Sequence, residues 1–484
     1  MSKLKELLQP SHIVPLIVAS AFFMENLDGS VINTALPQMA LSMGVSAVDM
    51  SIGITSYLIT LAAFIPVSGW FADRFGAQRV FGSAVAVFTL ASIGCALSDS
   101  VHAFTLARIL QGMGGAMMVP VGRLIVLRIT PKDQLVKVVA LITWPGLMAP
   151  IVGPPLGGFI TTYFSWHYIF YLNVPLGLIG LWLIKKYISN QSEQSKRPLD
   201  FIGFLLIGLG LASFVMGVES LGNEGLTVRC GELFLACALL GLLAWVHTKR
   251  HPSPLLNFSV LRVHTFGIIF FWGSLTRVCI GATPFLAPLM FQVAFGYNAF
   301  ASGLLLLSAM LGNLGLKPFT PKLLRRFGFR TILLGNGCLA ACAAFAIGLL
   351  SPNASVVLIA MVMLVYGITR SMQFTCIQTM AFADVPSEQM SGANTLFSTM
   401  AQLTQGVGVA LGATMIHASV YLRQGDINHP QTNDFTLAFS LVGALILVSL
   451  LGYRGLRLDA GASVSKHEKF QIQTSKPSTS TSTP

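Results

Sequence analysis

Uninterrupted apolar stretches of about 20 residues recur along the whole chain, and they limit its possible folds more than any other feature. A helix of that length crosses the hydrocarbon core of a bilayer. Of the 484 residues, 54% are hydrophobic and only 10% are charged, whereas soluble domains usually carry about 25% charged residues. The sequence therefore excludes an ordinary soluble enzyme and predicts an all-α integral membrane protein.

We predict fourteen membrane-spanning helices joined by short polar segments. They lie near residues 13–35, 50–72, 79–98, 103–124, 138–162, 167–186, 200–220, 230–248, 266–293, 300–318, 330–350, 354–376, 391–418 and 435–454. The N-terminal MSKLKELLQPSH lacks the apolar part and cleavage site of a signal peptide, so we expect the first span to be retained. An even number of spans places both termini on one side of the membrane.

The positions of the basic residues predict which side that is. Most of the 30 Lys and Arg residues, including Arg123 and Lys317, fall in predicted loops on one face, whereas Arg229 and Arg423 lie on the other. Because positive loops stay in the cytoplasm, we expect both termini to be cytoplasmic. The net charge of +12 then reflects topology, and we expect no nucleic-acid partner.

An internal repeat divides the chain. RFGAQR begins at Arg74 and RFGFR begins 252 residues later, at Arg326. Repeated halves are a common architecture of transporters. We therefore predict a six-helix bundle over 1–190, two inserted transmembrane helices over 198–250 and a second six-helix bundle over 262–456. The Ser/Thr/Pro-rich segment 457–484 is predicted to be a disordered cytoplasmic tail.

Two carboxylates stand near the centre of the first span. Glu25 and Asp28 are three residues apart and so share one helix face. Each costs about 2.5–3.5 kcal/mol at mid-membrane, and their repulsion favours keeping a proton on one of them. Two interpretations remain open: a proton-coupling site, or an Asp28 that is permanently paired, for instance with Arg108 in the fourth span.

Three further motifs suggest helix contacts and charge networks. The loop GWFADRFGAQR combines Gly69, which allows close approach, with a possible network of Asp73, Arg74 and Arg79. The fourth span contains LARILQGMGG, in which Arg108 needs a buried partner. The fifth span contains APIVGPPLGG, whose prolines and glycines suit a kinked helix or a tight seam.

These motifs together resemble the major facilitator superfamily, in its fourteen-span drug/proton antiporter branch, over residues 10–455. The resemblance implies that the loop motif latches the cytoplasmic gate by pairing with the other bundle, through Gly69, Asp73, Arg74, Gly76 and Arg79. It also implies proton coupling by Asp28 and Arg108, and location in the bacterial inner membrane. Glu25 lies outside the family motif, and its role in proton coupling is expected only from its position beside Asp28. The matching antiporter motif, which favours export over uptake, comprises Pro150, Gly153, Pro154, Gly157 and Gly158.

The substrate cavity is predicted to be polar and mixed in charge. Arg277 lies nearly one repeat length after Asp28, at a similar depth in the second half, and Arg370 lies at a comparable depth in the twelfth span. Arginines facing the two carboxylates would admit anionic or zwitterionic substrates. The residues expected to line the cavity are Phe23, Asn33, Gln111, Met113, Trp144, Arg277, Arg370 and Gln373.

The sequence as a whole favours a proton-coupled efflux antiporter that exports small amphipathic compounds of the multidrug type by alternating access. We expect a monomer in the lipid bilayer, with a small-molecule substrate and protons as partners. No triad, nucleotide loop or clustered metal ligands appear in the sequence, so we expect no enzyme activity, no metal site and no cofactor beyond the proton gradient. The alternatives are a dedicated exporter of an anionic or zwitterionic metabolite or metal chelate, and a non-transporting membrane receptor.

Overall fold

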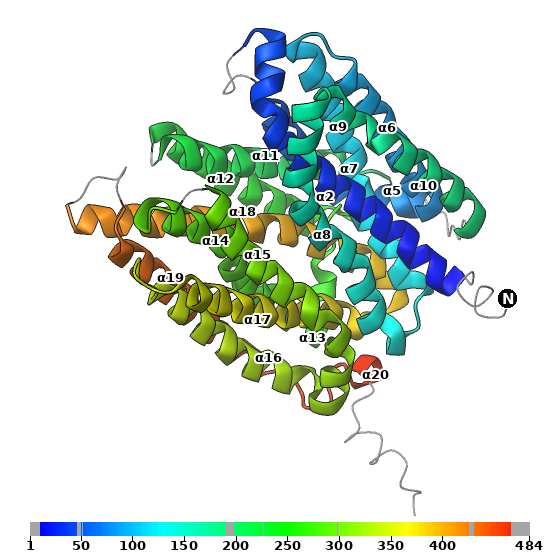
Figure 1. The fold of residues 1–484 in the computed structure, drawn as a ribbon. Coiled ribbons are helices and arrows are strands. Elements are labelled where there is room, and N and C mark those ends of the chain that lie inside the picture. The colour runs from blue at the N-terminus through cyan, green and yellow to red at the C-terminus, as the bar shows by residue number, and fades with distance from the viewer. Residues whose placement is uncertain are drawn as a thin grey trace, which may run out of the picture.

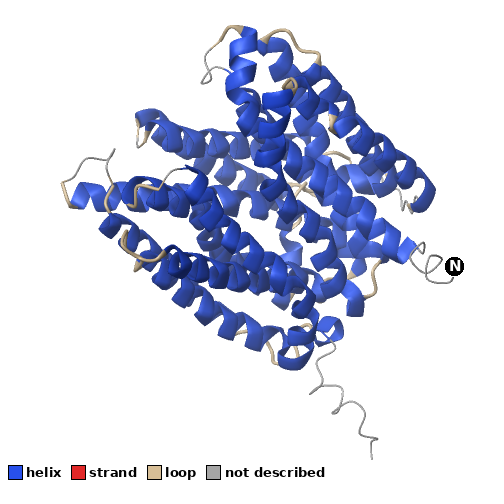
Figure 2. Ribbon diagram, in the orientation of Figure 1, coloured by secondary structure: helices blue, strands red, loops and turns tan. Residues whose placement is uncertain are grey.

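The computed structural model describes residues 10–45, 50, 52–189, 198–225, 227–297, 299–424 and 430–465, and all regular structure in these residues is helical (Figure 2). The first half contains α2 (Pro10–Met43), α4 (Ile52–Phe64), α5 (Ser68–Phe75), α6 (Ala77–Ala96), α7 (Val101–Ile129), α8 (Leu135–Tyr163), α9 (His167–Tyr171) and α10 (Asn173–Tyr187). The inserted pair is α11 (Phe201–Glu224) and α12 (Val228–Arg250). The second half contains α13 (His264–Ile268), α14 (Ser274–Leu289), α15 (Ala299–Leu316), α16 (Thr320–Gly348), α17 (Val356–Ala383), α18 (Met390–Leu422), α19 (Thr432–Tyr453) and α20 (Ala462–Ser465).

Long apolar helices dominate the described part of the chain, which confirms the all-α membrane architecture. Twelve segments are long and apolar enough to cross a membrane. One of them, Ala301–Gly348, holds most of α15 and all of α16, joined by a short 3₁₀ turn. The 29-residue helix α8 is not among the twelve. The count of fourteen spans stays a prediction.

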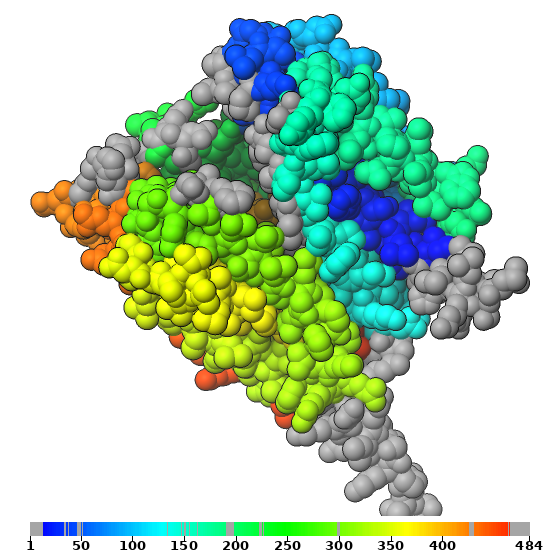
Figure 3. Space-filling view, in the orientation of Figure 1, coloured from blue at the N-terminus to red at the C-terminus, as the bar shows by residue number. Residues whose placement is uncertain are grey.

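The two halves repeat the same helix packing. In the first half α2 packs on α8, α4 on α7, and α6 on both α7 and α10. In the second half α14 packs on α18, α15 on α17, and α16 on both α17 and α19. The halves occupy separate regions of Figure 1, and in Figure 3 they meet along a seam. The repeat that the two RFG segments indicated therefore extends to helix packing.

The glycines of the two RFG segments share an unusual backbone conformation. Gly76 has φ 90° and Gly328 has φ 74°, values that glycine adopts far more readily than other residues. Gly76 ends α5, and Gly328 interrupts α16. The repeated glycine thus turns the chain in the same way in both halves.

The inserted pair contacts both halves through one helix. α11 packs against α12, and also against α4 of the first half and α18 of the second. The rings of Phe204 and Phe64 lie 5.3 Å apart, edge to face. Figure 1 shows α11 and α12 next to each other between the two halves. Movement of either half against the other must therefore be accommodated at α11.

The segment that follows α19 folds back onto the bundle. Residues 457–465 lie within the predicted tail, yet they form turns and end in α20. Val464 is buried, as is the preceding Leu456, and such burial holds a segment in place. Residues 466–484, the rest of the predicted tail, lie outside the described residues.

Candidate functional site

Asp28 lies at the centre of a buried polar cluster in the first half. Its Oδ2 is 2.7 Å from Nη1 of Arg108, and both side chains are fully buried. Its Oδ1 accepts hydrogen bonds from Nε2 of Gln111 and Nδ2 of Asn173, each at 2.8 Å. One ion pair and two amide donors thus compensate the charge of a single carboxylate and connect α2, α7 and α10.

Arg108 is held by the same half of the molecule. Its Nε donates to the carbonyl of Gly53 at 3.3 Å, and Nη1 also donates to Oε1 of Gln111 at 2.5 Å. The guanidinium carbon lies 4.3 Å from the centre of the Tyr57 ring. In this conformation Asp28 is therefore a fixed, paired anion, as one of the two sequence-based interpretations proposed.

Sequence reasoning missed two members of this cluster, Asn173 and Tyr57. The available signal for Asn173 was a single amide in the apolar run YIFYLNVPLG. A buried amide needs partners, but the sequence does not show which helix supplies them.

Glu25 has a different environment from Asp28, although it lies less than one turn away. It is half-buried, and its Oε2 is buried without a hydrogen-bond partner among the described residues. A Cβ atom built at Gly115 would lie 3.6 Å from the Glu25 carboxyl carbon and 2.9 Å from the hydroxyl of Tyr57. An unpaired buried carboxylate is costly, so this environment favours a Glu25 that carries a proton.

The loop motif brings the halves together through its glycine. A side chain at Gly69 would collide with Thr395 of α18, and the hydroxyl of Ser391 donates to the Gly69 carbonyl at 3.5 Å. Asp73 instead pairs with Arg128 of its own half, at 2.9 Å. The family pattern predicted that charge pairing reaches the other bundle. In this conformation the Asp73 pair stays within the first half because α7 ends beside the loop.

Further contacts between the halves lie at the same end of the molecule, which we call the motif end. Nδ2 of Asn394 donates to the carbonyl of Pro120 at 2.8 Å. Lys317, near the second RFG segment, donates to the hydroxyl of Thr143 in α8 at 3.4 Å. The halves are therefore closed against each other at the motif end.

The antiporter motif forms a tight seam within the first half. A Cβ atom at Gly153 would collide with the hydroxyl of Ser30 in α2, and that hydroxyl donates to the carbonyl of Ala149 at 3.2 Å. Gly157 is buried, whereas a Cβ atom at Gly158 would meet open space. The side chains of Pro150 and Pro154 lie outside those described. Among the described side chains, the motif therefore serves as a close-packing contact between α8 and α2.

Several residues predicted to line the cavity lie elsewhere. Gln111 belongs to the buried Asp28 cluster. Gln373 is fully buried in the second half, where Asn336 donates to its Oε1 at 3.0 Å. In this conformation each amide satisfies a buried polar neighbour, and a role for either residue in a substrate cavity stays a prediction.

Other residues that were predicted to line the substrate cavity lie apart from one another. Met113 lines an open cavity of about 440 Å³ beside Arg79, bordered mainly by apolar side chains of α5, α6 and α7. Trp144 is 45% exposed and Phe23 is half-buried in the core of the first half. The side chain of Asn33 lies outside those described.

Two arginines from different halves converge on one aromatic ring. The guanidinium carbon of Arg277 lies 5.1 Å from the centre of the Phe397 ring, and that of Arg123 lies 5.8 Å from it. Arg277 also lies 5.2 Å from the ring of Phe374. Among the described residues, no carboxylate forms an ion pair with either arginine. The fourth predicted span ends near residue 124, just after Arg123, whereas α7 continues to Ile129 and places Arg123 well within the helix.

The sequence of the chain matches a known protein family. Residues 18–409 match the family model described as the Major Facilitator Superfamily. The chain belongs to this superfamily. It is 36% identical over 403 residues to multidrug resistance protein MdtD of Pectobacterium atrosepticum, covering 83% of this chain and 86% of that protein. It is 33% identical over 451 residues to MdtD of Yersinia enterocolitica, covering 92% and 95%.

Solved structures of the superfamily show the same fold. The human organic anion transporter MFSD10 aligns with a TM-score of 0.63 at 15% identity, covering 92% of this chain and 99% of that chain. The proton:xylose symporter XylE also aligns with a TM-score of 0.63 at 15% identity, covering 94% and 98%. The twelve apolar helices, the family match and the bacterial MdtD relatives make this superfamily member a multi-pass protein of the bacterial inner membrane.

Proposed function

We propose that this superfamily member is a proton-coupled efflux antiporter that exports small amphipathic compounds of the multidrug type. The names of its MdtD relatives support multidrug export. Proton coupling is supported by a difference between two carboxyl groups of α2: Asp28 is paired with Arg108, whereas Glu25 is unpaired. The transporter works as a monomer with both termini in the cytoplasm and uses the proton gradient as its only drive.

Glu25 is the better placed of the two carboxyl groups to load and release the proton. Asp28 already accepts three donors, whereas Oε2 of Glu25 and Nη2 of Arg108 are both buried without partners. Tyr57 interacts electrostatically with Glu25, Asp28 and Arg108, so the four groups form one network. Release of the proton from Glu25 creates a second anion that competes with Asp28 for Arg108, and this loosens the contact of α2 with α7.

Alternating access supplies the movement to which this network is coupled. The midplane site of such transporters opens to one side at a time as the two bundles rock. The motif end is closed by Gly69, Asn394 and Lys317, so this conformation is the one in which access from the cytoplasm is blocked. The proton step on α2 then biases the opening of the Gly69 contact with α18.

Purified protein in proteoliposomes with an imposed pH gradient tests the assignment. We expect Glu25→Gln to abolish substrate-induced proton movement while binding of a fluorescent lipophilic substrate persists. The matched control is Glu232→Gln, which removes an exposed carboxyl group near the start of α12. If Glu25→Gln couples substrate to protons as well as the wild type does, Glu25 is not the proton carrier.

The second candidate function is export of a dedicated anionic or zwitterionic metabolite or metal chelate. The convergence of Arg123 and Arg277 on Phe397 favours it, because two like charges near each other are stabilised by an anion between them. Lys317 and Arg370 add positive charge to the second half. We expect Arg277→Gln to raise the KM of an anionic substrate about tenfold or more, as expected from losing a charge-assisted hydrogen bond of ~1.5–3 kcal/mol.

A transport screen separates the two candidates. If unrelated lipophilic cations drive proton release and Arg277→Gln leaves their transport unchanged, the multidrug assignment holds. If only anions drive proton release, the dedicated exporter replaces it.

A further inference from the structure

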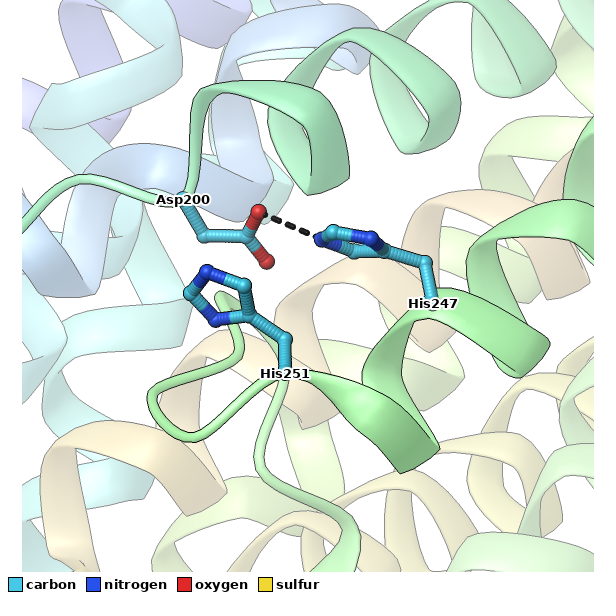
Figure 4. A group of neighbouring side chains, drawn as sticks. All are labelled: Asp200, His247 and His251. Atoms are coloured by element: carbon cyan, nitrogen blue, oxygen red, sulfur yellow. Dashed lines mark hydrogen bonds and ion pairs between the residues drawn. The ribbon is translucent and has the colours of Figure 1, made fainter.

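Three potential metal ligands meet at the motif end of the inserted pair. Asp200 precedes α11, His247 lies in the last turn of α12, and His251 follows that helix directly. One ligand atom from each lies within 4.8 Å of the other two. Figure 4 shows both imidazole rings beside the Asp200 carboxylate. Sequence analysis predicted no metal site, because Asp200 is far from the two histidines along the chain.

We propose that Asp200, His247 and His251 form a binding site for a divalent transition-metal ion of the zinc class. Two imidazole nitrogens and one carboxylate oxygen are ligands that zinc prefers, at about 2.0–2.2 Å. Tetrahedral zinc places its ligand atoms about 3.4 Å apart, so the widest separation in this cluster, which is at most 4.8 Å, must shorten by no more than about 1.4 Å. The fourth position remains open for water or another ligand.

The present hydrogen bonds show how the site is held ready without metal. Oδ1 of Asp200 accepts from Nε2 of His247 at 2.7 Å and from the backbone N–H of Gly203 at 2.8 Å. Oδ2 accepts only a longer bond, from the N–H of Leu255 at 3.2 Å. Three donors, from Gly203, His247 and Leu255, thus already orient the carboxylate oxygens of Asp200.

Metal binding must exchange existing contacts for metal bonds. The proton of His247 that points at Asp200 moves to the other ring nitrogen, which leaves Nε2 free to bind. The N–H of Ser253 donates to Nδ1 of His251 at 3.2 Å, and this contact is lost when His251 reorients or changes tautomer. The metal therefore joins α11 and α12 directly and changes the segment after α12, which runs past Ser253 and Leu255.

The site adjoins the gate between the two halves. A polar cavity of about 300 Å³ is lined by Asp200 and Ser253 together with Gly69 and Asp73 of the loop motif and Glu388 of the second half. The cavity gives a hydrated ion a path of entry, which any metal site needs. Because residues of both halves line this cavity, the metal site lies beside their junction at the motif end.

The experiment uses the full-length protein in detergent, purified through a tag without histidines and stripped with a chelator. Zn²⁺ is titrated in competition with a chromophoric chelator. We expect one equivalent to bind tightly to the wild type, and the affinity to fall by at least an order of magnitude in His247→Gln and in His251→Ala. His264→Ala is the matched control, since His264 is an exposed histidine outside the cluster, and it should bind as the wild type does.

Thermal unfolding supplies the second measurement. Zn²⁺ should raise the Tm of the wild type and of His264→Ala, but not that of His251→Ala, whose metal-free Tm should match the wild type. A second control, Cys338→Ser with Cys342→Ser, removes two exposed thiols and should keep the zinc effect. The proposal is overturned if the wild type does not bind, if His247→Gln and His251→Ala bind unchanged, or if the thiol variant loses binding. Because binding is measured without transport, this result is independent of the antiporter assignment.

Discussion

The two halves share a backbone plan but differ in their buried charges. In both, the same pairs of helices pack and a glycine with positive φ follows the repeated Arg-Phe. The first half buries a compensated pair, Asp28 with Arg108. The second half carries Arg277 at the corresponding place, with no recorded carboxylate partner among the described residues.

This difference shows which properties a duplicated fold keeps and which it can change. Helix packing depends on small residues and apolar surface, so it survives extensive substitution. Buried charges depend on single residues, and they can be assigned separately in each half. In our proposal the first half handles protons and the second half recognises the charge of the substrate.

The largest effect should come from breaking the compensated pair of the first half. Arg108→Gln leaves Asp28 without its cation, and removing one partner of a buried pair costs about 3–5 kcal/mol. We expect a large fall in Tm, measured in detergent by intrinsic fluorescence. The double variant with Asp28→Asn should recover most of the stability but not the transport. If the double variant is as unstable as the single variant, compensation is not what the pair supplies.

The next effect compares the equivalent seams α2–α8 and α14–α18. A side chain at Gly408 would collide with the carbonyl of Val278, whereas one at Gly153 would meet the side chain of Ser30. A side chain can rotate away and a backbone carbonyl cannot, so Gly408→Ala should cost more, within the ~1–3 kcal/mol typical of overpacking. Urea or thermal unfolding of both variants measures this. Equal losses would mean that both seams adjust equally.

A nearly equal effect in the two halves is expected at the repeated turn. Gly76→Ala and Gly328→Ala each force a side chain into a backbone region that essentially only glycine adopts, at a cost of about 1–3 kcal/mol. Because φ is 90° and 74° at the two positions, the two losses in Tm should be similar. A clear loss for one variant alone would show that the turns are not equivalent.

The smallest effect on stability is expected from Arg277→Gln. It removes one of two buried like charges that repel each other, so the Tm should stay the same or rise, in contrast to Arg108→Gln. Thermal unfolding of the two single variants side by side gives the comparison. A fall in Tm as large as that of Arg108→Gln would reveal a carboxylate partner for Arg277 and remove the distinction between the halves.

Residues of the candidate site could be predicted only where their neighbours along the chain were enough to indicate their role. The pairing of Asp28 with Arg108 was one of two open interpretations, because both charges stood in apolar runs. Asn173, Tyr57 and Arg123 were not anticipated, since their partners lie on helices distant in sequence. The hydrogen bond of Gln373 with Asn336 was not anticipated either, because a lone polar residue in a span can face a cavity or satisfy a neighbouring helix, and periodicity does not separate the two.

The sequence alone determined the membrane-embedded helical class, the division into two repeated halves and the family motifs, because apolar length, repeat spacing and glycine positions act locally along the chain. Only the tertiary structure decided that Asp28 is fully paired while Glu25 is not, that Gly69 rather than Asp73 contacts the other half, and that Asp200 meets His247 and His251. These features depend on which side chains from separate helices come within a few ångströms, and that distance is set by the packing of the whole bundle.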